Sequence, residues 1–357
     1  MSPANVFIFA PADKSGDTHQ KLEAAGCKLV LGSASWETPM GDNESEMVAM
    51  AQGADAMCGT SIRSTPITRR VLEASENLRV VAKYTIGVDD IDVDAATEMG
   101  ILVTNAPTES NWGAVAEGTI SIMLCVMKKL RERDRHLKSG GYWRDSGLEG
   151  AYIGSREEDG YPGITLGIVG LGRIGSRVSK LMRPWGIQIL ACDPYVPSEK
   201  FGECGVEQTD LKTLLRQSDV VSLHVTLTKE TRHMIGEEEF KLMKPDAVLL
   251  NTSRGYVVDE AALARALENG VIAAAALDAF EDEPLAMDSP LRKLGDKVLL
   301  SPHMIASNRG VGLLGAGVQW GTRSVLAALR GEVPDCVFNT DVLPRWQERF
   351  GGKSIIS

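Results

Sequence analysis

The run G-I-V-G-L-G-R-I-G at residues 167–175 constrains the fold of this chain more than any other feature. Gly170, Gly172 and Gly175 have the spacing G-x-G-x-x-G, directly after an apolar run and before a helical pattern, S-R-V-S-K-L-M. Asp193 ends the next apolar run, 18 residues beyond Gly175. A strand, a glycine-rich turn, a helix and an acid after the second strand together predict a dinucleotide-binding βαβ unit.

The three glycines have distinct expected roles. Gly170 permits the tight turn, Gly172 lets a pyrophosphate approach the backbone, and Gly175 lets the helix pack on the strand. The backbone N–H groups of Arg173 and Ile174 lie at the predicted helix N-terminus. We expect them to face the phosphates, because an N-terminus presents N–H groups and positive potential.

Asp193 is expected to select the cofactor. Its carboxylate can accept hydrogen bonds from the adenosine ribose hydroxyls, and it repels a 2′-phosphate. The following Pro194-Tyr195 supply no arginine to offset that repulsion. The sequence therefore predicts NAD rather than NADP. The alternative is an aspartate that only ends a strand before a proline.

Alternating short apolar runs and helical patterns occupy the chain on both sides of this motif. Strands are predicted at 6–10, 27–31, 55–59, 79–83 and 101–105, and then at 164–169, 187–192, 220–225, 247–251, 272–277 and 297–301. One long helix is predicted over 113–139, a loop over 142–163, a final helix over 311–329 and a polar tail after it. With 357 residues, this pattern predicts an α/β chain with two doubly wound parallel-sheet domains.

Composition excludes several function classes. A net charge of −10 without a basic stripe argues against nucleic-acid binding. The apolar runs are too short to span a membrane, and the N-terminus does not resemble a signal peptide. Six scattered cysteines without a C-x-x-C pair indicate thiols in a reducing compartment, and the five histidines show no metal-ligand spacing. We expect a cytoplasmic protein without a metal site.

Polar residues follow the predicted strands of the second series. They are Gly170, Asp193, His224, Thr226, Thr252, Ser253, Arg254, Asp278 and His303. The carboxyl ends of parallel strands share one edge of the sheet, where ligands bind in such folds. We therefore expect these residues to line one cofactor site.

Three of the groups at this edge have the chemistry that hydride transfer to a keto acid requires. Arg254 can clamp a carboxylate and polarise the adjacent carbonyl, and His303 can exchange a proton near neutral pH. An acid from L-D-A-F-E-D-E-P, at 277–284, would orient such a histidine and raise its pKa. Each has a plainer alternative: a structural histidine, an arginine that closes a turn, and a solvated acidic loop.

Several motifs in order resemble the D-isomer-specific 2-hydroxyacid dehydrogenases, a family that includes D-3-phosphoglycerate dehydrogenase, glyoxylate and hydroxypyruvate reductases and D-lactate dehydrogenase. The blocks are G-I-V-G-L-G-R-I-G, S-L-H-V-T-L-T-K-E-T-R-H-M-I, L-L-N-T-S-R-G-Y-V-V-D-E-A-A-L, L-D-A-F-E-D-E-P and S-P-H, preceded by I-R-S, T-I-G-V-D-D-I-D and A-V-A-E. The resemblance covers about residues 55–340.

The resemblance implies roles within the acidic run. Glu283 would pair with His303 as the catalytic acid/base, and Asp278 would lie by the nicotinamide carboxamide. Glu281 and Asp282 receive no role and are expected to form a solvated loop. Arg254 would bind the substrate carboxylate and keto oxygen.

The resemblance also implies contacts elsewhere. Ile86 and Gly87 would offer backbone N–H groups to the substrate carboxylate, with Arg63 as a further contact. The backbone around Val225, Thr252 and Ser253 would line the cofactor.

The family fold implies a domain division with a cleft. Residues 1–110 and 305–340 would form a flavodoxin-like substrate domain, 111–304 a Rossmann NAD-binding domain and 341–357 a C-terminal tail. The site would lie in the cleft between the domains, and the long helix would pack against a second subunit in a homodimer.

Departures from the family pattern leave the substrate open. Asp90 stands where Asn is frequent, Gly118 where His is common, Thr226 where Pro is frequent, and Ile305 is bulkier than usual. The expected function is an NAD-dependent D-2-hydroxyacid dehydrogenase. Two alternatives stay open: a short-form D-3-phosphoglycerate dehydrogenase, in which Arg63 or Lys83 would bind phosphate, and an NAD(H)-sensing protein similar to the family's corepressors.

Overall fold

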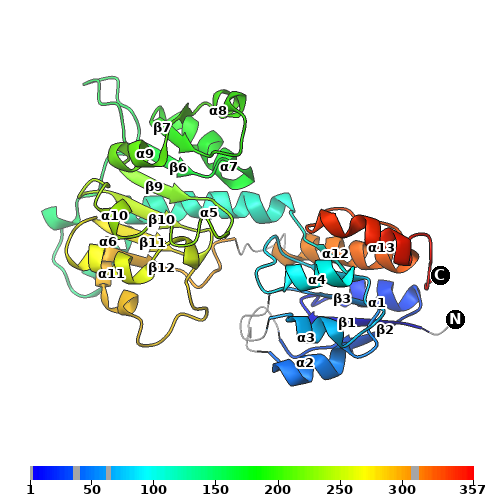
Figure 1. Ribbon diagram of the computed structural model, residues 1–357. Helices are drawn as coiled ribbons and strands as arrows, with labels where there is room; N and C mark the ends of the chain where they lie inside the picture. The colour runs from blue at the N-terminus through cyan, green and yellow to red at the C-terminus, as the bar shows by residue number, and fades with distance from the viewer. Residues whose placement is uncertain (1–2, 35–40, 62–65, 307–312) are drawn as a thin grey trace. The chain divides into compact units, whose positions relative to one another are not determined.

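The chain folds into two compact units, which are described separately. The structure is a computed structural model that describes all residues except 1–2, 35–40, 62–65 and 307–312 (Figure 1). Unit 1 contains Met1–Asn111 and Asn308–Ser357, and unit 2 contains Trp112–Ser307. Each unit holds one parallel sheet, so the predicted α/β class with two parallel sheets is confirmed.

Unit 1 has a five-stranded parallel sheet in the order β2-β1-β3-β4-β5. The strands are β1 (Ala4–Ala10), β2 (Cys27–Leu31), β3 (Ala56–Gly59), β4 (Val80–Lys83) and β5 (Leu102–Thr104). All five were predicted from their apolar runs. Burial is nearly continuous along β1, β3, β4 and β5, as a sheet with both faces covered requires, whereas the edge strand β2 is only partly buried.

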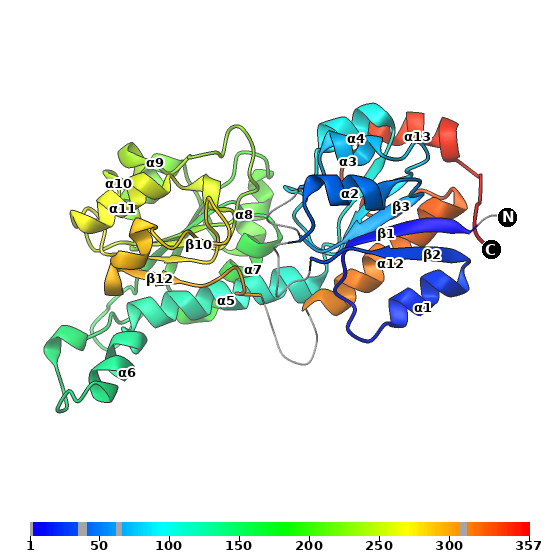
Figure 2. The same cartoon turned by 90° about the horizontal axis from the view of Figure 1, so that it is seen from below.

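Helices cover both faces of this sheet (Figure 2). They are α1 (Asp17–Ala24), α2 (Glu44–Ala51), α3 (Arg69–Glu73), α4 (Val93–Met99), α12 (Leu313–Arg330) and α13 (Leu343–Phe350). One core lies between the sheet and α2, α3 and α4, and a second lies between the sheet and α1, α12 and α13.

The segment after Asn339, expected to be a polar tail, contains α13 and packs into the second of these cores. Trp346 is fully buried, and its Nε1 donates to the backbone oxygen of Arg79 at 2.9 Å. The Arg79 guanidinium lies 4.9 Å from the Phe350 ring centroid and donates to the Lys353 oxygen at 2.7 Å. The charged residues between Trp346 and Phe350 concealed this buried face in the sequence.

Unit 2 has a seven-stranded parallel sheet in the order β12-β11-β10-β9-β6-β7-β8. The strands are β6 (Thr165–Val169), β7 (Gln188–Cys192), β8 (Glu207–Gln208), β9 (Val220–Leu223), β10 (Val248–Asn251), β11 (Ala274–Leu277) and β12 (Val298–Leu300). The strand order reverses between β6 and β9, and ligands of such sheets bind at the carboxyl ends beside that point.

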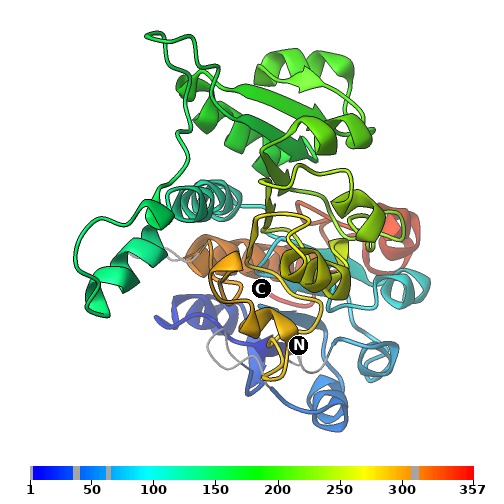
Figure 3. The same ribbon diagram turned by 90° about the vertical axis from the view of Figure 1, so that its left-hand side faces the viewer.

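The helices of unit 2 also cover both faces of its sheet (Figure 2). They are α5 (Glu109–Met127), α6 (Leu130–Lys138), α7 (Arg173–Met182), α8 (Ser198–Cys204), α9 (Leu211–Gln217), α10 (Glu237–Phe240) and α11 (Glu260–Glu268), of which α5 begins in unit 1. One core contains side chains of α9, α10 and α11, and the other contains side chains of α5, α7 and α8. Figure 3 shows α6 and the following loop at the edge of unit 2.

The single helix predicted over 113–139 is wrong, because two helices meet there at Lys129. Lys129 has φ 52°, a left-handed conformation that ends α5 after Met127. The side chains of Lys128 and Lys129 donate to the backbone oxygens of Ala151 and Gly147, both at 2.7 Å. These bonds fasten the 142–163 loop beside the break.

Candidate active site

The glycine-rich turn joins β6 to α7. Gly170 has φ +93°, and a Cβ added there would lie 2.7 Å from the backbone oxygen of His224. A Cβ at Gly175 would collide with the Gly170 oxygen, whereas a Cβ at Gly172 would meet nothing within 4 Å. The first and third glycines are therefore required by close approach, and the second leaves its backbone open to a ligand. This cradle fits a pyrophosphate.

Asp193 follows β7 and fastens the glycine-rich turn. Its two oxygens accept hydrogen bonds from the backbone N–H groups of Leu171, at 2.8 Å, and Tyr195, at 2.9 Å. These two contacts are structural, and the role of Asp193 in selecting the cofactor stays a prediction. The carboxylate lies beside the turn that is expected to hold the phosphates.

Arg254 lies just beyond β10, and its backbone is held tightly. The Asn251 side chain donates to the Arg254 oxygen at 2.9 Å, and Arg254 Nη1 donates to the Ser253 oxygen at 2.8 Å. The hydroxyls of Thr252 and Thr119, on α5, are 2.8 Å apart. The contacts of Asn251, Ser253 and Thr119 thus hold the backbone segment from which the Arg254 side chain extends.

His303 lies beyond β12, and its imidazole faces Glu283. Nδ1 lies 2.8 Å from Oε1 of Glu283 and 3.0 Å from Oε2. The side chains are 30% and 13% exposed, so the pair is partly shielded but open to a small substrate. Within unit 2, the geometry brings together the two residues that the resemblance paired.

Asp278 holds the turn that contains His303. Its Oδ1 accepts from the Ser301 hydroxyl at 2.5 Å, and its carboxylate accepts from the N–H groups of Met304 and Ile305. His303 has φ 53°, a left-handed conformation that is uncommon for non-glycine residues and that these hydrogen bonds support. Burial raises the pKa of Asp278, while these hydrogen bonds oppose the rise.

Glu281 departs from its expected place in a solvated loop. Its side chain is 26% exposed and binds both the start of α11 and His233. Asp282, the next residue, is exposed as expected. No sequence signal identified Glu281, because its partners come from distant segments.

His224, expected beside the cofactor, directly follows β9 and is half-buried, with its Nδ1 atom shielded from solvent. Its Nε2 lies 2.9 Å from the Ser222 hydroxyl, and burial lowers the pKa of His224 to about 4. The imidazole is therefore neutral at physiological pH. Val225, which follows it, is half-buried and Thr226 is exposed. The segment lies next to the glycine-rich turn, because Gly170 closely approaches the His224 carbonyl.

Two of the departures from the family pattern are in contact. A Cβ at Gly118, on α5, would collide with the side chain and carbonyl oxygen of Ile305. The larger Ile305 therefore depends on the absence of a side chain at position 118. Both departures are visible in the sequence. Only the structure shows that Gly118 leaves the space that Ile305 occupies.

The expected substrate contacts of unit 1 lie after β4. Ile86 and Gly87 are half-buried, and the Ile86 oxygen accepts from the Asn105 side chain at 2.9 Å. Arg63 lies outside the described residues. Lys83 is fully buried, and its ammonium lies 2.5 Å from a carboxylate oxygen of Asp90. Lys83 is therefore no exposed cation for a phosphate.

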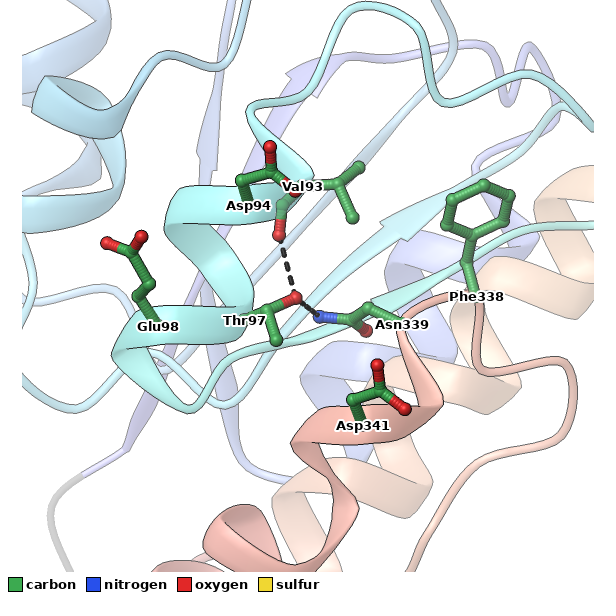
Figure 4. Close-up of a pocket in the computed structure, with 7 residues that line it drawn as sticks. All are labelled: Val93, Asp94, Thr97, Glu98, Phe338, Asn339 and Asp341. Atoms are coloured by element: carbon green, nitrogen blue, oxygen red, sulfur yellow. Dashed lines mark hydrogen bonds between the residues drawn. The ribbon is translucent and has the colours of Figure 1, made fainter. Parts of the chain in front are cut away.

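A separate pocket in unit 1 does not fit a keto acid (Figure 4). The residues that line it are Val93, Asp94, Thr97, Glu98, Phe338, Asn339 and Asp341. Three of these described residues are carboxylates and none is a lysine or arginine. The Asn339 amide donates to the Thr97 hydroxyl at 2.9 Å, so it has a structural use.

The part of the chain that carries these site residues is similar to a known protein family. Residues 120–305 match the family model of the D-isomer specific 2-hydroxyacid dehydrogenase, NAD binding domain. This match contains the glycine-rich turn, Arg254, Glu283 and His303.

Relatives and solved structures extend the similarity beyond this domain. The chain is 39% identical over 314 residues to the glyoxylate reductase of Korarchaeum cryptofilum, with 86% of this chain and 90% of that enzyme covered. It is 39% identical over 331 residues to the D-3-phosphoglycerate dehydrogenase of Methanocaldococcus jannaschii, with 92% of this chain but only 60% of that enzyme's length covered. A crystal structure of D-lactate dehydrogenase from Aquifex aeolicus, complexed with NAD and lactic acid, aligns with a TM-score of 0.78 at 28% identity and covers 92% of this chain and 96% of that one.

Proposed function

Because this chain belongs to the family of D-isomer-specific 2-hydroxyacid dehydrogenases, we propose that it is an NAD-dependent oxidoreductase that interconverts a small D-2-hydroxy acid and its 2-keto acid. The observation that carries this proposal is the His303–Glu283 pair on the sheet edge that also holds Arg254 and the glycine-rich turn. Acid/base, carboxylate-binding and cofactor-binding groups are then all present in unit 2.

The cofactor is NAD, which when bound supplies or accepts the hydride. Arg173 and Ile174, at the N-terminus of α7, would hold its phosphates through backbone N–H groups, with Gly172 leaving the approach open. Asp193 would bind the ribose hydroxyls and repel a 2′-phosphate. Thr252, Ser253 and the backbone at Val225 would line the remainder of the site.

Arg254 and His303 would act on the substrate. The guanidinium would bind the carboxylate and polarise the keto oxygen, and the N–H groups of Ile86 and Gly87 would add contacts to the carboxylate. With Nδ1 of His303 facing Glu283, proton exchange with the substrate oxygen would take place at Nε2. Glu283 would stabilise the imidazolium ion, and Asp278 would keep the His303 turn in place.

A small 2-keto acid fits these residues better than a phosphorylated one. Lys83, one of the two cations suggested for a phosphate, is buried against Asp90. Among the described residues at the site, Arg254 is the cation that a substrate carboxylate would use. We therefore place glyoxylate, hydroxypyruvate or a similar acid ahead of 3-phosphohydroxypyruvate.

We further propose that the protein is a cytoplasmic homodimer that uses the α6 region as an interface. Leu130, Leu137, Tyr142 and Trp143 are exposed by 50%, 54%, 98% and 64%. Such a group of exposed apolar residues is typical of an interaction surface. All six cysteines are free thiols, which fits a reducing compartment. In the described part of the chain, no helix is long and apolar enough to cross a membrane.

The test of the function is NADH consumption, followed by absorbance, with a panel of 2-keto acids. The panel contains glyoxylate, hydroxypyruvate, pyruvate, phenylpyruvate and 3-phosphohydroxypyruvate, and Arg254→Ala is the control. Turnover that disappears in the variant supports the proposal. NADH binding without turnover of any of these acids contradicts it. Light scattering of the purified protein tests the dimer.

A further inference from the structure

The carboxylates of the acidic segment at residues 278–284 bind two different parts of unit 2, the turn that contains His303 and the start of α11. Asp278 and Glu283 bind the His303 turn and the His303 imidazole. Glu281 points instead to the start of α11, which is Glu260. The segment is thus fastened on two sides within unit 2.

The contacts of Glu281 are reciprocal. Its Oε1 accepts from the backbone N–H of Glu260 at 3.1 Å, and its own N–H donates to Oε1 of Glu260 at 2.6 Å. The same Oε1 of Glu281 lies 3.0 Å from Nε2 of His233. Two contacts of the side chain and one of the backbone N–H thus hold Glu281 in one place.

These contacts act on a segment that touches both sides of the candidate active site. A Cβ at Gly255, directly after Arg254, would collide with the carbonyl of Phe280 and the N–H of Glu281. The Phe280 N–H also donates to Oε1 of Glu283 at 3.1 Å, the oxygen that faces His303. Movement of the backbone at 280–281 would therefore shift the backbone beside Arg254. It would also change the orientation of the Glu283 carboxylate.

The segment needs this fastening because its charges repel one another. Glu281, Asp282 and Glu283 are consecutive, and Glu260 lies against them. Burial, together with the neighbouring carboxylates, raises the pKa of Glu260. The hydrogen bond from the Glu260 N–H and the contact with His233 Nε2 offset this repulsion and keep the backbone at 280–281 against Gly255.

We propose that Glu281 is a positioning residue for proton transfer: by binding the first turn of α11, it holds Glu283 at the distance from His303 that the reaction requires. The role rests on the proposed function of the same site. It acts through geometry, so the reach of the side chain matters more than its charge.

Two substitutions separate reach from charge. Glu281→Asp keeps the carboxylate but shortens it by one methylene, so it should no longer reach the Glu260 N–H. Glu281→Gln keeps the length and one acceptor oxygen. We expect kcat to fall roughly tenfold or more in Glu281→Asp, as for other small misplacements of catalytic groups, with the KM for NADH little changed. Glu281→Gln should retain most of the activity. Asp282→Asn, one residue along and exposed, is the matched control and should behave as wild type.

A double-mutant cycle then asks whether Glu281 acts through Glu283. In a Glu283→Gln background, Glu281→Asp should cost less than about twofold in kcat, because the oriented carboxylate is already gone. Equal losses in both backgrounds would mean that Glu281 only stabilises the fold, and would overturn the inference. A normal rate for Glu281→Asp, or a loss in Glu281→Gln as large as in Glu281→Asp, would overturn it as well.

NMR of the histidine imidazoles tests the role of Glu281 without measuring turnover. The result can therefore be read even if the proposed dehydrogenase activity is not found. The chain has five histidines, so the His303 resonances can be assigned with a His303→Gln variant. In the NAD-bound protein, Glu281→Asp should shift the pH titration of the His303 resonances in the direction that Glu283→Gln shifts it, and Asp282→Asn should not. If no keto acid is reduced, the function fails while this readout still decides the role of Glu281. An unmoved His303 titration overturns the role.

Discussion

The His303 imidazole and the Glu283 carboxylate face each other through both carboxylate oxygens, with Nδ1 2.8 Å from Oε1 and 3.0 Å from Oε2. A carboxylate in this position fixes the orientation of the ring and leaves Nε2 as the nitrogen that can face a substrate. Oε1 also accepts from the Phe280 N–H, so the acid is itself oriented by the backbone. The pair couples the acidic run after β11 to the turn after β12.

Replacing Glu283 with Gln should move the pH profile of keto-acid reduction to lower pH. Reduction needs a protonated His303, so its rate falls as pH rises through the titration of this imidazole. Without the carboxylate, the imidazolium loses a stabilising charge, and the fall should come at lower pH. Steady-state rates from pH 5 to 9 measure this shift. An unchanged profile would argue against the pairing, and Asp282→Asn is the control for removing a nearby charge.

Replacing Arg254 should weaken the action on substrate without removing cofactor binding. In Arg254→Ala we expect kcat/KM for the keto acid to fall by roughly 10²–10³-fold or more, since a charged contact that strengthens in the transition state is lost. Arg254→Lys keeps the charge but not the two-pronged geometry, and should recover only part of the activity. NADH fluorescence titration should show affinity near that of wild type. A variant with normal kinetics would remove Arg254 from the proposed role.

His224 should make the folded state less stable in acid. Burial lowers its pKa from 6.5 to about 4, so below pH 6.5 the unfolded chain binds a proton that the folded chain does not. The stability contributed by neutral His224 is therefore complete above 6.5 and is lost as pH falls toward 4, by about 2 kcal/mol between pH 7 and pH 5. Urea unfolding of wild type and His224→Gln at both pH values measures the difference. Equal pH dependence in the two proteins would contradict a buried neutral imidazole.

Trp346 should stabilise unit 1 without contributing to the chemistry. Its side chain is fully buried and hydrogen-bonded to the Arg79 backbone, so Trp346→Ala should lower the free energy of unfolding by about 3–5 kcal/mol. Gln347→Ala, at the next and exposed position of α13, should change it little. Thermal unfolding followed by circular dichroism compares the two. A similar, small effect of both substitutions would mean that α13 is not packed as described.

Much of the fold could be predicted because buried parallel strands have short, continuously apolar sequences. All strands except β8 were found in this way, and β8 was missed because Glu207–Gln208 is short and exposed. The break at Lys129 was missed because no glycine or proline marks it. The docking of α13 was missed because Trp346 depends on Arg79, far away in the sequence.

The site residues that directly follow a strand could be predicted from the sequence. The residues after β6, β7, β10, β11 and β12 follow from the rule that ligands bind at the carboxyl ends of parallel strands. The contacts of Glu281 with Glu260 and His233 were not predictable, because they depend on how three loops meet. The same is true of Ile305 against Gly118.

Transfer of label from cofactor to substrate shows directly whether the protein reduces a 2-keto acid with the hydride of NADH. NADH carrying deuterium at the transferable position of the nicotinamide is incubated with each keto acid of the panel, and the product is analysed by mass spectrometry and, where chiral, by chiral chromatography. We expect deuterium at C2 of a 2-hydroxy acid of D configuration, and loss of this product in Arg254→Ala. NADH that binds without yielding a labelled 2-hydroxy acid from any acid tested, or an L product, would contradict it.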